Sequence, residues 1–155
     1  MAAATDNTLI LDTTKGEVVI EMRPDLAPTH VARIKELVRE GFYDGVVFHR
    51  VIEDFMAQTG CPEGTGTGGS GQKLKAEFSK EKHTRGTVSM ARAANPDSGD
   101  SQFFICFDEA PWLNGQYTVW GAVTEGMDNV DKIKRGEPVS DPDKIVTARM
   151  AADAK

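Results

Sequence analysis

Arg50 stands in the middle of an apolar segment, VVFHRVI, which covers residues 46–52. Because side chains alternate across a β-strand, Arg50 is expected to share one face with Phe48 and Ile52, with no carboxylate beside it there. A guanidinium keeps its proton at physiological pH and carries five N–H donors. An arginine in such surroundings either extends its head group into water or takes part in binding or catalysis.

Large apolar side chains and two glutamines accompany this arginine along the chain. They are Phe55, Met56 and Gln58, which follow it closely, and then Gln102-Phe103-Phe104 and Trp112-Leu113. Taken one at a time, such phenylalanine and leucine residues are more typical of a hydrophobic core than of a site. Their functional meaning therefore depends on whether they act as a set.

The familiar motifs of hydrolytic enzymes are absent. His30, His49 and His83 are scattered along the chain, form no HExxH motif and have no cysteines at zinc spacing, so we expect no metal site. No GxSxG motif is present for a serine nucleophile. His49 lies between apolar residues, and we interpret it as a hydrogen-bonded core histidine.

The glycine-rich segment GTGTGGSG, residues 64–71, matches the GxGxxG spacing twice. That spacing indicates a dinucleotide site only where a strand precedes it and a helix follows. Residues 72–75 offer no convincing helix cap, and no GK[ST] completes a phosphate loop. We interpret the segment as a surface loop. A nucleotide-dependent enzyme is the alternative, and it would require nucleotide to protect the fold against heat.

Length and composition are typical of one folded acidic domain covering residues 1–155. The net charge is −6 and no lysine- or arginine-rich segment occurs, which argues against nucleic-acid binding. No apolar segment approaches the ~20 residues of a membrane helix, and residues 1–10 do not resemble a signal peptide. Cys61 and Cys106 form no CxxC pair and are interpreted as reduced thiols. We therefore expect a cytoplasmic monomer without membrane partners.

Short β-rich segments and two helical ones must position these residues. Residues 8–14 and 16–22 read as a hairpin. A helix should begin at Pro28-Thr29 and end at Gly41, with Val31, Ile34, Leu37 and Val38 on its apolar face. The other expected elements are strands at 46–52, 86–91, 101–107, 117–123 and 144–150 and a second helix at 127–134. Many short strands with two helices suggest a closed or nearly closed antiparallel sheet.

Three blocks of sequence resemble the cyclophilin-type peptidyl-prolyl cis-trans isomerases: FHRVIEDFMAQTG, SMARAANPDSGDSQFFIC and PWLNGQYTVWGAV. The resemblance extends over nearly the whole chain, and the compact length is similar to that of bacterial members. It implies an all-β fold, an eight-stranded antiparallel closed barrel capped by two α-helices. It also implies an enzyme that isomerises X–Pro bonds in peptides and folding proteins, with cyclosporin as an inhibitor.

The resemblance assigns roles to individual residues. Arg50 matches the catalytic arginine of the family. The proline pocket is matched by Phe55, Met56, Phe104 and Leu113. The groups near the substrate backbone are matched by Gln58, Gln102, Ala91, Arg92 and Ala93, of which the last three lie against the residue before proline. Trp112 matches the rim tryptophan that bears on cyclosporin binding.

Two positions depart from the family pattern. Tyr117 stands where many members carry histidine beside the proline pocket, and Arg92 stands where many carry asparagine. A tyrosine keeps a ring and a polar group, so we expect activity to be retained. We expect the charge of Arg92 to favour acidic residues before the proline.

The chemistry of this reaction agrees with the missing motifs. Rotation about an X–Pro bond breaks no bond, so it needs no nucleophile, general base, metal or cofactor. As the bond twists, the prolyl nitrogen regains a lone pair, to which the guanidinium of Arg50 can donate only in that state. The rival hypothesis is a non-catalytic proline-binding module. The presence of Arg50 favours catalysis, because binding alone requires only the pocket.

Overall fold

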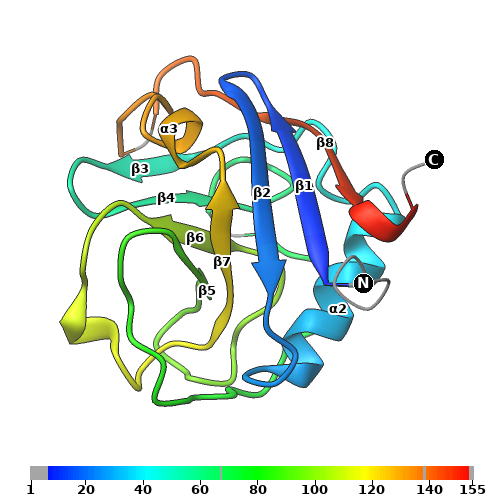
Figure 1. Ribbon diagram of the computed structural model, residues 1–155, viewed down its shortest axis with the longest axis vertical. Helices are drawn as coiled ribbons and strands as arrows, with labels where there is room; N and C mark the ends of the chain where they lie inside the picture. Colours follow the sequence, from blue (N-terminus) through cyan, green and yellow to red (C-terminus); the bar gives the residue numbers. More distant parts are fainter. Residues whose placement is uncertain (1–6, 67, 138, 154–155) are drawn as a thin grey trace.

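The computed structural model describes residues 7–66, 68–137 and 139–153. Within them the chain forms one eight-stranded antiparallel sheet in the order β3-β4-β6-β5-β7-β2-β1-β8, with α2 and α3 at opposite ends (Figure 1). The strands are β1 (Thr8–Thr13), β2 (Gly16–Met22), β3 (Arg50–Ile52), β4 (Met56–Thr59), β5 (Thr87–Met90), β6 (Phe103–Cys106), β7 (Val119–Glu125) and β8 (Ile145–Met150). The α-helices are α2 (Pro28–Arg39) and α3 (Met127–Val130), and the 3₁₀ helices are η1 (Pro111–Leu113) and η2 (Ala151–Asp153).

The first hairpin and the first helix follow their sequence signals. β1 pairs with β2 through a turn that ends at Gly16, whose φ of 126° is one that residues with a side chain rarely adopt. Proline occupies the first turn of α2, where its missing N–H costs no hydrogen bond. Gly41 follows the helix in a left-handed conformation, and its N–H bonds the Val38 carbonyl at 3.1 Å. The apolar face predicted for this helix is buried.

The prediction of a closed barrel is wrong, because the sheet is an open half-barrel with β3 and β8 at its two edges. Residues 46–49, expected to be part of a strand, instead form irregular backbone contacts with residues 143–145. These contacts include the isolated bridge between Val47 and Lys144 and a bond from the Phe48 N–H to the Asp143 carbonyl at 2.8 Å. Residues 46–49 and 143–145 therefore do not form a continuous ladder of strand hydrogen bonds.

Three other elements differ from their predicted extents. β3 begins only at Arg50, and the preceding Phe48 is fully buried in the main core, so the expected alternation across 46–52 does not hold. The strand β4 was not predicted, because its sequence MAQT mixes polar and apolar residues within four positions. The second helix has only four residues instead of the eight expected.

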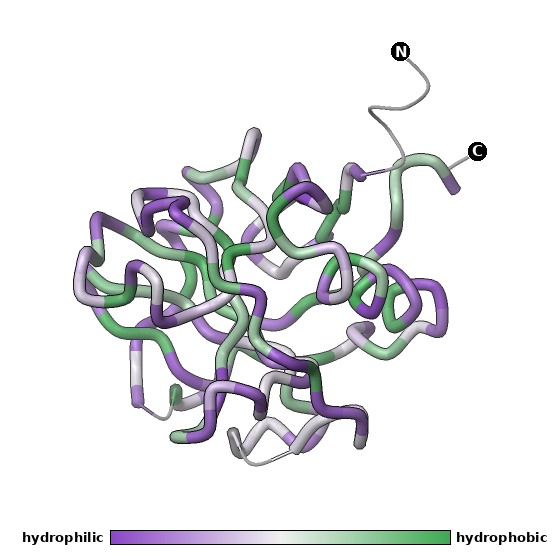
Figure 2. The backbone as a smooth tube through the Cα atoms, turned by 90° about the horizontal axis from the view of Figure 1, so that it is seen from below, coloured by the Kyte–Doolittle hydropathy of each residue, from purple (hydrophilic) through white to green (hydrophobic). Residues whose placement is uncertain are grey.

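Two apolar clusters divide the interior. The main one fills the sheet and its contact with α2, and it includes Phe103 and Trp120. The smaller one lies on the opposite face of β4 and β6 and consists of Met56, Phe104, Cys106, Ala110 and Leu113. Hydrophilic and hydrophobic residues alternate over short distances along the chain (Figure 2). Among the described residues, no helix has the length and hydropathy required to cross a membrane.

Candidate active site

A cavity of about 120 Å³ opens over the smaller apolar cluster. The register of three strands builds it, because Arg50 of β3 pairs with Gln58 of β4, which pairs in turn with Phe104 of β6. Residues paired in this way across a sheet project from the same face, so their side chains lie side by side. The sheet therefore brings a cation, an amide and an aromatic ring to one surface.

Nine of the twelve site residues expected from the sequence line this cavity. They are Arg50, Phe55, Met56, Gln58, Ala91, Arg92, Phe104, Leu113 and Tyr117. Two others, Ala93 and Gln102, line a neighbouring cavity of about 220 Å³, which shares Ala91 and Arg92 with the first. The remaining residue, Trp112, lies at the rim.

Hydrogen bonds hold the guanidinium of Arg50 from two directions. Its Nη1 donates to Gln58 Oε1 at 3.2 Å, and its Nε donates to Glu137 Oε2 at 2.9 Å. Gln58 Nε2 in turn donates to Gln102 Oε1 at 2.9 Å. Sequence reasoning missed Glu137, which lies 87 positions away from Arg50 and carries no local signal. Arg50 is thus positioned on one side by the hydrogen-bonded side-chain amides of Gln58 and Gln102, which we call the amide chain, and on the other side by the carboxylate of Glu137.

The apolar wall of the cavity is well packed. Met56, Phe104 and Leu113 are 1%, 5% and 6% exposed, so these side chains are almost fully packed against their neighbours. Phe55 packs against Trp112 with ring centroids 5.6 Å apart, and Trp112 remains 62% exposed. Such a wall can accept a small apolar group without rearrangement.

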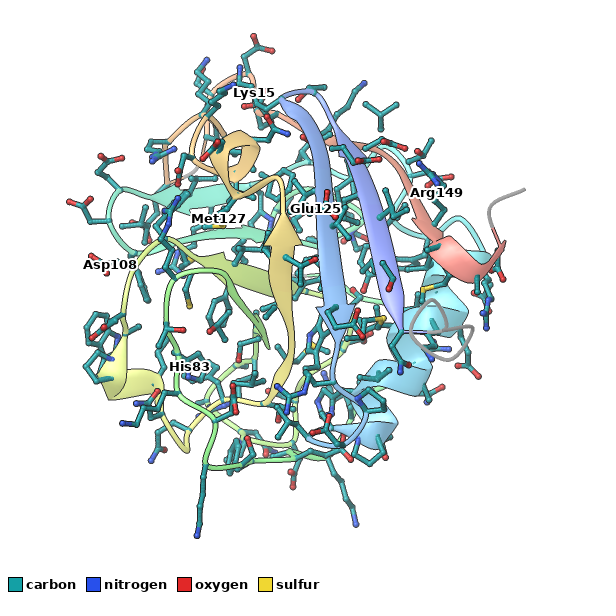
Figure 3. All side chains as sticks on the ribbon, in the orientation of Figure 1. Lys15, His83, Asp108, Glu125, Met127 and Arg149 are labelled. Atoms are coloured by element: carbon teal, nitrogen blue, oxygen red, sulfur yellow. The ribbon has the colours of Figure 1, made fainter. Side chains whose placement is uncertain are left out.

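A buried histidine supports the cavity from behind. His83 Nε2 lies 2.9 Å from Ser89 Oγ, and the imidazole stacks on the Phe104 ring with centroids 6.1 Å apart. Its backbone N–H donates to Asn114 Oδ1 at 2.7 Å, which ties His83 to the segment that follows η1. His83 itself is labelled in Figure 3, in the segment that precedes β5. Burial lowers the pKa of His83, which favours the neutral ring. The sequence, with charged residues around His83, did not predict this role.

The other histidines occupy different environments. His30 Nδ1 lies 2.7 Å from Glu77 Oε1 at the start of α2. His49 is buried as expected, but neither ring nitrogen has a hydrogen-bond partner within the described part of the chain, which corrects the expectation of a hydrogen-bonded ring. No group of three or more histidine, cysteine, aspartate or glutamate side chains suited to a metal is found among the described residues.

The glycine-rich segment surrounds the sulfur atom of Cys61. The N–H groups of Gly66 and Gly68 donate to Cys61 Sγ, each at 3.3 Å. Burial acts to raise the pKa of the Cys61 thiol, but these and neighbouring N–H groups outweigh it and lower the pKa. The carbonyl groups of Gly66 and Gly68 accept bonds from Gln102 Nε2 at 2.9 and 3.0 Å. The segment therefore supports the edge of the site. Among the described residues, no α-helix follows it before β5, as a dinucleotide site would require.

These features define a class of antiparallel β protein, one with an apolar cavity on the outer face of a half-barrel and a fixed guanidinium at its mouth. The family model described as "Cyclophilin type peptidyl-prolyl cis-trans isomerase/CLD" matches residues 8–150. The chain belongs to this family of enzymes, which isomerise X–Pro peptide bonds, and the resemblance inferred from the sequence is confirmed.

Relatives and solved structures agree with this assignment. A probable peptidyl-prolyl cis-trans isomerase of Brucella suis is 57% identical over 171 residues, which cover 99% of this chain and 87% of that protein. Peptidyl-prolyl cis-trans isomerase B of Bacillus subtilis is 46% identical over 124 residues, covering 79% and 86%. The crystal structure of a cyclophilin from Hirschia baltica has a TM-score of 0.90 at 33% identity, covering 97% of this chain and 76% of that one.

A second solved structure was determined in the presence of a dipeptide. It is a Cryptosporidium parvum cyclophilin type peptidyl-prolyl cis-trans isomerase, crystallised in the presence of the dipeptide Ala-Pro. Its TM-score is 0.86 at 28% identity, and the match covers 92% of this chain and 98% of that one.

Proposed function

We propose that this enzyme isomerises X–Pro bonds by holding the proline ring in the 120 Å³ cavity while Arg50 donates a hydrogen bond to the twisted prolyl nitrogen. Its substrates are proline-containing peptides and folding proteins, and residues 1–155 act as a single domain. No covalent intermediate, metal or cofactor takes part.

The observation that carries this proposal is the position of Arg50 at an apolar cavity. The guanidinium is held by Gln58 and Glu137, and the opposite wall consists of buried Met56, Phe104 and Leu113. A planar amide is more polar than the twisted one, so an apolar surface favours the twisted state. A fixed donor at the cavity mouth favours the same state, because only there does the prolyl nitrogen offer a lone pair.

Rates indicate that Arg50 cannot act alone. Uncatalysed isomerisation takes tens to hundreds of seconds. A turnover of ~10³ per second therefore requires an acceleration of about five orders of magnitude, which corresponds to lowering the activation free energy by ~7 kcal/mol. A hydrogen bond from a charged donor contributes roughly 1.5–3 kcal/mol. The remainder must come from holding the ring while the preceding carbonyl turns and from excluding water, which is the part we assign to the apolar wall.

Two further observations bear on substrates and inhibitors. The Cryptosporidium parvum relative crystallised with Ala-Pro supports a dipeptide-sized recognition element for this chain. Trp112, exposed at the rim beside Phe55, supports an accessible surface on which cyclosporin could pack, and inhibition by cyclosporin stays a prediction.

Truncation of the cavity wall tests the pocket assignment. We expect Phe104→Ala to raise KM for a short Ala-Pro peptide by about tenfold or more, because it removes an aromatic ring from the apolar wall of the cavity. The measurement is steady-state isomerisation by NMR exchange spectroscopy. A matched truncation in the main core, Val18→Ala on β2, should lower the Tm but leave KM unchanged. An unchanged KM in folded Phe104→Ala would place the proline elsewhere.

A further inference from the structure

The two residues that depart from the family pattern contact each other. The guanidinium carbon of Arg92 lies 4.4 Å from the centroid of the Tyr117 ring, above its face. A cation over an aromatic face is attracted by the negative charge of the ring's π-system. These two residues come from separate segments, yet both line the cavity beside Arg50.

Arg92 is tied down by main-chain carbonyl groups and is not a free cation. Its Nε and Nη2 donate to the Gln116 carbonyl at 3.0 and 2.7 Å, and its Nη1 donates to the Ala93 carbonyl at 2.9 Å. The side chain therefore joins the segment after β5 to the segment before β7. A planar fork of donors suits this arrangement, which a lysine could not reproduce.

Tyr117 also contacts two other rings. It makes an edge contact with Phe104, with centroids 5.8 Å apart and an interplanar angle of 80°. A second edge contact, at 6.5 Å, joins it to the buried ring of His83. The guanidinium lies above a face of the same ring, so we infer that the orientation of Tyr117 at the cavity depends on Arg92.

We propose that Arg92 is a positioning residue, which acts through Tyr117 to fix the wall of the cavity that receives the proline ring. The two residues work as one unit, and neither keeps its role without the other. This inference rests on the proposed function of the cavity and adds a pair of positioning residues to it. It is an alternative to the sequence-based expectation that Arg92 favours acidic residues before the proline, and it is supported by the engagement of most donors of Arg92 with carbonyl groups.

A double-mutant cycle tests the coupling. Arg92→Met keeps the length of the side chain and removes its charge and donors, and Tyr117→Leu removes the aromatic face. Each should raise KM by about fivefold, with kcat changed less, since a cation–π contact and its supporting hydrogen bonds are lost. The double variant should be no worse than the poorer single variant, because both changes remove the same unit. Tyr117→Phe keeps the aromatic face, so it should raise KM less than Tyr117→Leu does.

A peptide series separates positioning from charge recognition. We expect Arg92→Met to lose about the same factor on Ala-Pro, Glu-Pro and Lys-Pro peptides. Arg92→Lys, which keeps the charge but not the fork, should lose nearly as much as Arg92→Met. A loss confined to Glu-Pro, or full recovery in Arg92→Lys, would overturn the proposal in favour of charge recognition. Losses that multiply in the double variant would also overturn it.

The wild type and Arg50→Ala, assayed on the same peptides, keep this test separate from the proposed function. If the wild type shows Arg50-dependent turnover and the cycle is additive, only the pairing of Arg92 with Tyr117 fails. If the wild type shows no turnover, the proposed function itself fails. The Tm of every variant confirms that it is folded.

Discussion

The guanidinium of Arg50 is positioned by two partners of unequal strength. Gln58 lies next to it in the sheet and is itself fixed by Gln102, whose amide is held by the glycine-rich segment. The ion pair with Glu137 is open to water, with the two side chains 40% and 59% exposed. Exposed ion pairs contribute little, because solvent screens the charges and ordering two long side chains costs entropy. We therefore assign most of the orientation of Arg50 to the amide chain.

Substitutions at the two partners should separate these contributions. We expect Gln58→Leu to lower kcat by about tenfold, because it frees Arg50 and leaves Gln102 without its donor. Glu137→Gln should change kcat by less than about threefold. Steady-state kinetics on one Ala-Pro peptide, with the Tm as a control for folding, measures both. A larger loss of kcat in Glu137→Gln than in Gln58→Leu would mean that the ion pair, and not the amide of Gln58, sets the orientation of Arg50.

For individual residues, the sequence predicts which residues belong to the site better than it predicts the contacts between them. The FHRVIEDFMAQTG and SMARAANPDSGDSQFFIC blocks identified Arg50, Gln58 and Phe104, which the structure places on adjacent strands. Contacts between residues far apart in sequence, such as that of Arg50 with Glu137, leave no local pattern. The contact between Arg92 and Tyr117 was not predicted from the sequence for the same reason.

Among the elements, the short β4 strand matters most to the site. It carries Met56 and Gln58 and joins β3 to β6, yet its four residues are too few and too mixed to show a periodic pattern. The chain leaves β4 at Gly60, where φ is 99°. A Cβ added there would meet the Ser101 carbonyl oxygen and lie 2.8 Å from the Cα of Gln102. Glycine is thus required for the end of β4 to approach the segment before β6.

A pair of glycine substitutions measures this close approach. Gly71 has a similar φ of 96°, but a Cβ there would meet nothing within 4 Å. Gly71→Ala should therefore lower the unfolding free energy by about 1–2 kcal/mol, the cost of a left-handed alanine. Gly60→Ala should cost about 2 kcal/mol more, since the backbone must also shift. Chemical denaturation measures the difference, and equal losses would show that the contact is not restrictive.

Across the whole molecule, the alternation of short segments was enough to predict a mainly β fold with two helices. Whether the sheet closes depends on the shape of the backbone where residues 46–49 meet residues 143–145, and hydropathy carries no information about that shape. The same irregular backbone directly precedes β3, from which Arg50 reaches the cavity. The departure from a closed barrel therefore lies next to the site.

Three buried histidines should make the fold sensitive to mild acid. Burial lowers the pKa of His30, His49 and His83, so each ring is more readily protonated in the unfolded chain, where the pKa is about 6.5. The unfolded state then binds more protons, and the unfolding free energy should fall as the pH decreases from about 7 to 5. The lowered pKa of Glu77 has its effect at lower pH, below about 4.

Urea denaturation at a series of pH values measures this dependence. Replacing one of these rings, as in His49→Leu, should make the slope between pH 7 and 5 shallower. A stability that stays constant or rises over this interval in the wild type would contradict the burial of neutral histidines.

The central claim, that Arg50 supplies the catalytic hydrogen bond, is tested most directly by protease-coupled isomerisation of an Ala-Pro peptide. The wild type and Arg50→Ala are compared side by side, with circular dichroism to show that both are folded. We predict acceleration by the wild type and a loss of about tenfold to a hundredfold in kcat for Arg50→Ala, which corresponds to one charged hydrogen bond. Full activity in a folded Arg50→Ala protein would contradict the mechanism.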